Sequence, residues 1–84
     1  MKPIKIRKKP IVVEAMKYTG DNFEEIREWS GQPLKLDPAR KILLPTPEGP
    51  MKASRYDYVI KGVAGELYAI KPTFFYETYE ILED

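Results

Sequence analysis

Two apolar runs joined by a reversal bounded by glycines form the clearest pattern in this sequence. The runs cover 56–61 and 66–72, and Gly62-Val63-Ala64-Gly65 separates them. Glycines at the two ends of a short reversal allow positive φ at no steric cost, which is typical of a β-hairpin turn. The pattern therefore predicts a hairpin on which the rest of the chain is organised.

The register of this hairpin follows if Lys61 faces Glu66 across the turn. Because side chains alternate between the two faces of a strand, this register assigns every residue of the hairpin to one face. One face is apolar and is expected to meet the core, whereas the other is half solvated. The core face is predicted to pair Ile60 with Leu67 and Tyr58 with Ala69, and the other face Val59 with Tyr68 and Asp57 with Ile70.

The chain before the hairpin predicts one strand and one helix. Residues 10–18 are largely apolar and rich in β-branched side chains, which favours a strand buried on at least one face. Asp21 and Glu24 then resemble a capping box, and apolar residues recur at helical spacing until Gly31. This indicates an amphipathic helix of about ten residues that must dock on the sheet. Its stripe is Phe23, Ile26 and Trp29 or Ser30, with Trp29 expected to fill the core.

A proline-rich stretch follows the helix and predicts further short strands. Pro47-Glu48-Gly49-Pro50 is a strong turn signal. It indicates a second hairpin in which about 40–46 pairs with 51–55, and a short strand is expected over 33–36. Pro72 favours a single helical turn, after which 79–82 are expected to form a terminal strand. Together these elements predict one α+β domain over 1–84, with a bent antiparallel sheet of five or six strands and one helix packed on it.

Composition narrows the range of functions. The 84 residues contain neither cysteine nor histidine, so disulfides, thiolate metal sites and histidine catalysis are excluded. No nucleophile has an evident activating base, and no metal or phosphate motif is present, so we expect a non-enzymatic protein without cofactor or metal. No apolar run is long enough to span a bilayer, which favours a cytoplasmic protein without membrane association. Ten aromatic residues in so short a chain predict self-association, most simply as a homodimer.

Charge is segregated along the chain although the net charge is only +1. The first nine residues carry five basic side chains and no acidic one, whereas the last eight carry four acidic side chains and no basic one. One interpretation is a solvated strand edge whose lysines discourage unwanted pairing and attract Glu77, Glu80 and Glu83. The other is an arm that binds the phosphates of a nucleic acid, which the modest overall basicity makes less favoured.

Several blocks of the sequence resemble a family of small uncharacterised proteins encoded in bacteriophages and prophages. The resemblance covers nearly the whole chain and implies a phage or prophage origin and a cytoplasmic setting in the host. The blocks are Arg7-Lys8-Lys9-Pro10-Ile11-Val12-Val13-Glu14-Ala15, Tyr18-Thr19-Gly20-Asp21-Asn22, Thr46-Pro47-Glu48-Gly49, Asp57-Tyr58-Val59-Ile60-Lys61-Gly62-Val63 with Gly65-Glu66, and Lys71-Pro72 with Phe75 and Thr78-Tyr79-Glu80.

The sequence departs from this family pattern at one turn. Similar proteins usually read Ser-Pro-Gly-Asp-Tyr where this chain has Ser54-Arg55-Tyr56-Asp57-Tyr58. Because Pro and Gly at the centre of a tight turn are both replaced, the sequence no longer favours that turn, and the strand is expected to begin earlier.

Two binding functions remain, and a phage or prophage accessory protein could carry out either of them. The first is a protein-interaction module that binds a host or phage protein through aromatic residues. Its interaction patch is predicted to consist of Tyr56, Val59, Tyr68, Phe74 and Tyr76. The second is a binder of an anionic ligand, a nucleic acid or a nucleotide-like molecule, through the basic N-terminal arm. Its predicted ligand-binding residues are Lys5, Arg7, Lys8, Lys9 and Lys17.

Overall fold

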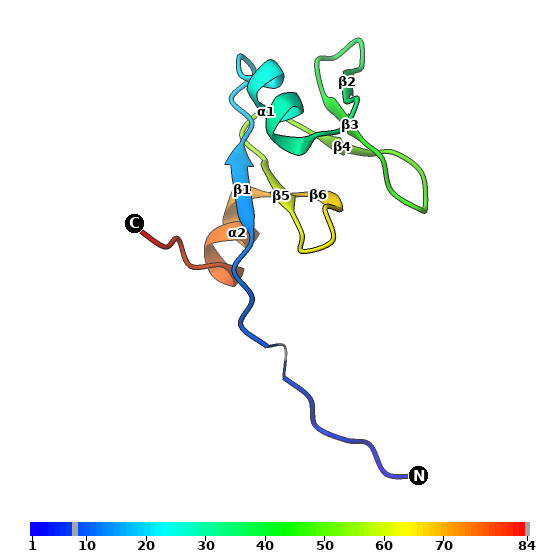
Figure 1. Cartoon of the computed structure of the whole chain (residues 1–84), viewed down its shortest axis with the longest axis vertical. Coiled ribbons are helices and arrows are strands. Elements are labelled where there is room, and N and C mark those ends of the chain that lie inside the picture. The colour runs from blue at the N-terminus through cyan, green and yellow to red at the C-terminus, as the bar shows by residue number, and fades with distance from the viewer. Residues whose placement is uncertain (8, 84) are drawn as a thin grey trace.

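The computed structural model describes residues 1–7 and 9–83, which form six short strands and two short helices (Figure 1). In chain order the elements are β1 (Glu14–Lys17), α1 (Phe23–Ser30), β2 (Lys35–Leu36), β3 (Ile42–Leu44), β4 (Met51–Ala53), β5 (Tyr58–Lys61), β6 (Leu67–Ile70) and α2 (Pro72–Thr78). Neither helix of the described chain is long and apolar enough to cross a membrane.

The strands form two antiparallel sheets of three strands each. One has the order β1-β5-β6 and the other β2-β3-β4. The predicted α+β class and the number of strands are confirmed, as are the second hairpin, the short strand near 35 and the helical segment after Pro72. The strands nevertheless divide between two sheets rather than one bent sheet, with a turn at 54–57 between β4 of one sheet and β5 of the other. The segment after Pro72 is longer than the predicted single turn and makes α2 a second helix.

The β5–β6 hairpin is present, but its register differs by one residue from the predicted one. Val59 pairs with Ala69, and the amide of Gly62 donates to the carbonyl of Glu66 at 2.8 Å. The turn therefore has three residues instead of four, and Gly65 closes it in the left-handed conformation with φ +83°. A left-handed residue after a tight turn is the usual way to close a three-residue hairpin loop, and glycine adopts it without strain.

This shift changes which side chains face the core. Val59 and Leu67 point toward α1 and the second sheet and are buried there, whereas Ile60 is buried on the opposite face. The prediction that Val59 lies on a half-solvated contact surface is therefore wrong, because the side chain is fully buried.

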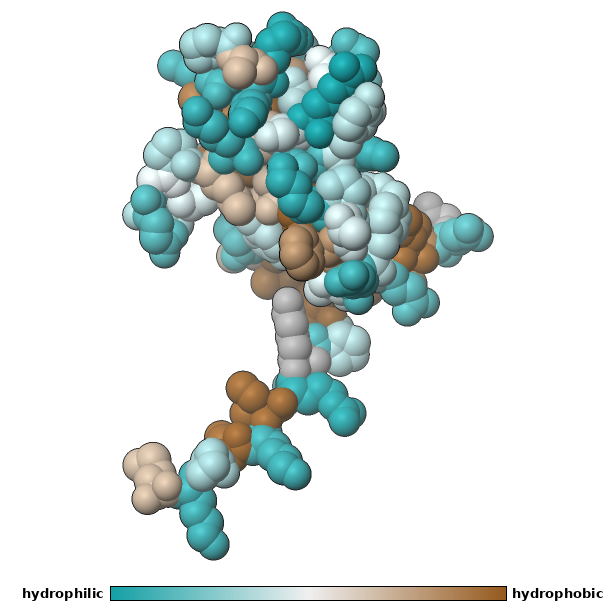
Figure 2. Space-filling model, turned by 180° about the vertical axis from the view of Figure 1, so that it is seen from behind, coloured by the Kyte–Doolittle hydropathy of each residue, from teal (hydrophilic) through white to brown (hydrophobic). Residues whose placement is uncertain are grey.

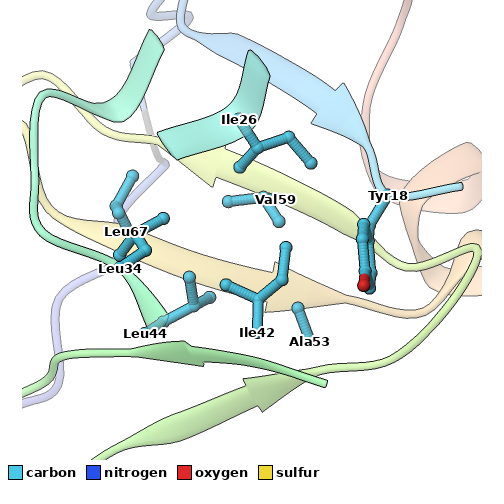
Figure 3. Packing of buried hydrophobic residues seen from close by; sticks show 8 residues of the cluster. All are labelled: Tyr18, Ile26, Leu34, Ile42, Leu44, Ala53, Val59 and Leu67. Carbon is cyan, nitrogen blue, oxygen red and sulfur yellow. The ribbon is translucent and has the colours of Figure 1, made fainter. Parts of the chain in front are cut away.

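One hydrophobic core lies between the two sheets and α1 (Figure 3). Ile26 provides the fully buried contact from α1, because its position faces both sheets at once. Trp29 is only partly buried at the margin of this core, and its indole nitrogen donates to a carboxylate oxygen of Glu14 at 3.2 Å. Trp29 is thus an edge residue rather than the predicted centre of the core. The buried cluster consists of Tyr18, Ile26, Leu34, Ile42, Leu44, Ala53, Val59 and Leu67.

The ends of α1 only partly follow the prediction. The left-handed Gly31 ends the helix as expected, with φ +71°. The helix begins after Asn22, however, and no capping box with Asp21 forms. The Asn22 side chain instead accepts from the amide of Thr19 and donates to the carbonyl of Lys17, at 2.9 and 2.8 Å. It therefore fixes the loop between β1 and α1.

Both chain ends differ from the predicted strands. β1 begins only at Glu14, and residues 10–13 form no strand. The terminal strand over 79–82 does not form either, because α2 continues to Thr78 and the chain then leaves the body with Ile81 and Leu82 exposed. Figure 1 shows the two ends departing in different directions.

Candidate functional site

The turn at 54–57 carries an unusual backbone conformation. The amide of Asp57 donates to the carbonyl of Ser54 at 3.0 Å, which closes the turn. Tyr56 has φ +76° and is one of two residues other than glycine with positive φ in the described chain, Arg40 being the second. A side chain in this region is strained by about 1–2 kcal/mol. The turn thus forms without proline or glycine, and the expectation that the strand begins earlier is wrong, because β5 begins at Tyr58.

The surrounding structure holds this strained turn in place. The carboxylate of Asp57 is only 3% exposed, accepts from the amide of Ser54 at 2.9 Å and pairs with the Lys71 ammonium group at 3.1 Å. The amide of Tyr56 donates to the carbonyl of Tyr18, and the amide of Tyr18 donates to the carbonyl of Asp57. Because these bonds fix the backbone on both sides, the ring of Tyr56 has a defined position.

That ring is half exposed and lies between two cationic side chains. The Arg55 guanidinium is 5.0 Å from its centroid and the Lys17 ammonium is 5.6 Å from it. The same ammonium lies 5.8 Å from the ring of Tyr58, so the cation is shared between two tyrosines. Cations at this distance are attracted by the negative faces of aromatic rings. We call the group of Lys17, Arg55, Tyr56, Tyr58 and Tyr76 the tyrosine patch.

Helix α2 supplies the third tyrosine of the patch. Pro72 favours the start of this helix, and Phe75 turns inward, where it stacks on the ring of Tyr58 at 3.7 Å. The next residue, Tyr76, then reaches the hydroxyl of Tyr58 with its own hydroxyl at 2.6 Å and stays 57% exposed. The stacking therefore anchors α2 to the outer face of the first sheet and fixes one rim of the patch.

Two tyrosines in this region resist ionisation. The hydrogen bond to Tyr76, with a smaller effect of burial, raises the pKa of Tyr58 to about 12. Burial, with the hydrogen bond to Tyr79, raises the pKa of Tyr68 to about 12. Both hydroxyls stay protonated at neutral pH, so they serve as hydrogen-bonding groups rather than as bases.

The structure brings together only part of the predicted interaction patch. Tyr56 and Tyr76 lie in the tyrosine patch, whereas Phe74 is exposed on the other flank of α2, since helical residues two apart point about 200° away from each other. Tyr68 is partly buried with its hydroxyl 3.0 Å from that of Tyr79, and Val59 lies in the core. Sequence reasoning assigned Tyr58 to the core and left Arg55 out. The absence of proline and glycine from 54–57 was the sequence signal that could have indicated them.

The predicted anion-binding residues do not form one site. Lys5, Arg7 and Lys9 lie in an exposed N-terminal arm, and Lys8 lies outside the described residues. Lys17 belongs to β1 and is part of the tyrosine patch instead. Within the described chain, no ion pair joins the arm to the acidic residues near the C-terminus, so the predicted pairing of the two ends does not occur inside one copy.

A groove of about 570 Å³ lies between the proline-rich turn at 45–51 and the start of β6. Its only ionisable walls are Glu48, Glu66 and Tyr68, so it offers no nucleophile with a base beside it. Across 1–7 and 9–83, no cluster of three carboxylates that could hold a metal ion occurs. This part of the surface is therefore a shallow, largely apolar groove.

The tyrosine patch is the described surface with the most distinct binding chemistry. It combines exposed aromatic faces, hydroxyl groups and two cations, and the strained turn fixes its central ring. Comparison of the chain with protein-family models, with curated proteins and with solved structures found no match.

Proposed function

We propose that this chain is a non-enzymatic protein-interaction module that docks on a protein partner through the tyrosine patch. The observation that carries the proposal is the conformation of Tyr56. A half-exposed aromatic ring is kept at a position where glycine would remove strain, so the ring serves something other than stability. Backbone strain of this kind concentrates at functional sites.

The chemistry of the patch fits a protein surface. Tyrosine gives a large contact area at low cost in side-chain entropy, and its hydroxyl tolerates a partly wet interface. Stacking on Phe75 and the hydrogen bond between Tyr58 and Tyr76 order the patch before a partner arrives. Preorganised side chains lose less entropy on binding.

Two cations give the patch its selectivity. Lys17 and Arg55 are exposed, and no described carboxylate pairs with either of them. An acidic side chain on the partner would find both cations beside the ring of Tyr56, so the proposed partner presents a carboxylate next to an apolar contact. The resemblance to phage and prophage proteins supports an accessory role in the host cytoplasm, with a host or phage protein as partner.

The proposal is tested by affinity capture from nuclease-treated host lysate with three proteins. Wild type and the control Glu25→Ala, on the exposed face of α1, are expected to retain the same protein band. Tyr56→Gly, which removes the ring and relieves the strain, is expected to lose it. A band that Tyr56→Gly retains would place the docking surface elsewhere. Nucleic acid recovered only without nuclease would favour the alternative, an anionic ligand held by the basic arm.

A further inference from the structure

The two chain ends carry complementary surfaces that do not meet within one copy. The N-terminal arm, residues 1–7 and 9–13, projects from β1 into solvent (Figure 1). Its Ile4 and Ile6 are 83% and 86% exposed. The C-terminal tail, residues 79–83, follows α2 and leaves Ile81 and Leu82 more than 60% exposed. Figure 2 shows this hydrophobic surface along the arm and on the tail.

The charges of the two segments are opposite. The arm carries basic side chains and no acid, whereas the tail and the last turn of α2 carry acids and no base. Each segment therefore combines exposed apolar side chains with charge of one sign. The described basic residues are Lys2, Lys5, Arg7 and Lys9, and the acidic ones are Glu77, Glu80 and Glu83.

We infer that the N-terminal arm of one copy packs on the C-terminal tail of a second copy, and that the exchange is reciprocal. One chain carries both halves of the contact, so a twofold dimer forms the same contact twice. At about 3.3 Å per residue, thirteen extended residues reach about 43 Å, enough to cross a neighbouring copy. The molecule itself measures 34 and 23 Å along its two shorter axes.

The place where the arm leaves the body supports this assignment. A hollow of about 180 Å³ lies there, lined by Ile11 and Val13 from the arm, by Gly62, Val63 and Glu66 around the hairpin turn, and by Tyr68 and Tyr79. Tyr79, the first residue of the tail, is one of its walls, and most of the exposed wall surface is apolar. An isoleucine from the arm of the second copy can be buried in this hollow, whereas Ile4 and Ile6 are exposed in a single copy.

Paired charge reversals test the inference in the full-length protein. The arm variant is Lys5→Glu/Arg7→Glu and the tail variant is Glu80→Lys/Glu83→Lys. In a dimer of either variant alone, like charges face each other at both contacts. The dimer dissociation constant should therefore rise at least about tenfold over wild type. A mixture of the two restores opposite charges at both contacts, and dimers should return. Sedimentation velocity at about 100 µM measures all three samples, with circular dichroism as the check on folding.

Matched controls change the same charge elsewhere on the surface. Lys35→Glu/Lys41→Glu and Glu25→Lys/Glu28→Lys should remain dimeric. Any of three results would overturn the inference. The wild type could be monomeric, the arm and tail variants could each remain dimeric, or the mixture of the two folded variants could stay monomeric. The tyrosine patch is unchanged in every variant, so these results stand apart from the proposed function.

Discussion

Tyr56 offers a direct measurement of the strain on which the proposed function depends. At an ordinary position, glycine is less stable than alanine by about 0.5–1 kcal/mol, because it loses more backbone freedom on folding. At φ +76° the order should reverse, since alanine keeps a left-handed strain of about 1–2 kcal/mol that glycine does not have. The two effects together make Tyr56→Gly more stable than Tyr56→Ala by about 0.5–1 kcal/mol.

Both variants lose the same ring, so its packing and its contacts with Arg55 and Lys17 cancel in the comparison. Urea unfolding followed by circular dichroism should give Tyr56→Gly a midpoint about 0.5–1 M above that of Tyr56→Ala, with equal slopes. Arg55 provides the matched control, because it lies in the same turn without positive φ. There, alanine should be more stable than glycine. The strain argument would be refuted if the urea midpoint of Tyr56→Ala equalled or exceeded that of Tyr56→Gly.

Three further predictions follow from burial and hydrogen bonding. Ile26→Ala should lower the free energy of unfolding by about 3 kcal/mol because the side chain is fully buried. Trp29→Ala should lower it by only about 1–2 kcal/mol because that side chain is partly buried, and urea midpoints in the opposite order would contradict the assigned core. Asp57→Ala should cost about 1–3 kcal/mol in the same assay by leaving the Ser54 amide without its acceptor, whereas Asp57→Asn should restore part of this. Folding raises the pKa of Tyr58 from 10.0 to about 12, so the contribution of this group to the stability of the fold is complete below pH 10 and is lost as the pH rises through 12. Absorbance titration at 295 nm should show the ionisation near pH 12, and Tyr76→Phe should bring the pKa of Tyr58 back toward 10.

Local patterns predicted most of the elements but not how they pack. The glycines around 62–65 and the Pro-Glu-Gly-Pro turn correctly indicated two hairpins, because turn chemistry is a local property. The register of the first hairpin was missed by one residue, since either a three- or a four-residue turn fits the same glycines. That error left Leu67 and Ala69 on the core face but exchanged the two faces of β5, so Val59 was placed on the surface and Ile60 toward the main core.

The candidate site was harder to predict because it depends on tertiary contacts. Tyr56 and Tyr76 are twenty residues apart and belong to one patch only through Tyr58, which contacts Tyr76 and shares the Lys17 ammonium with Tyr56. The positive φ of Tyr56 is held by hydrogen bonds that Tyr18 makes with the Tyr56 amide and the Asp57 carbonyl, which local propensity does not contain. The terminal strand failed for a related reason: its residues favour extended structure, but among the described residues of one copy they pair with none of the strands.

Site-specific photocrosslinking tests the central claim most directly. A benzophenone amino acid replaces Tyr76, which is 57% exposed in the tyrosine patch, or Val63, which is 73% exposed at the hairpin turn. Irradiation in nuclease-treated host lysate should give a discrete protein adduct from position 76 that is absent from position 63 and is lost when Tyr56→Gly is added. Equal adducts from the two positions, or an adduct at 76 that persists with Tyr56→Gly, would contradict a docking surface at the tyrosine patch.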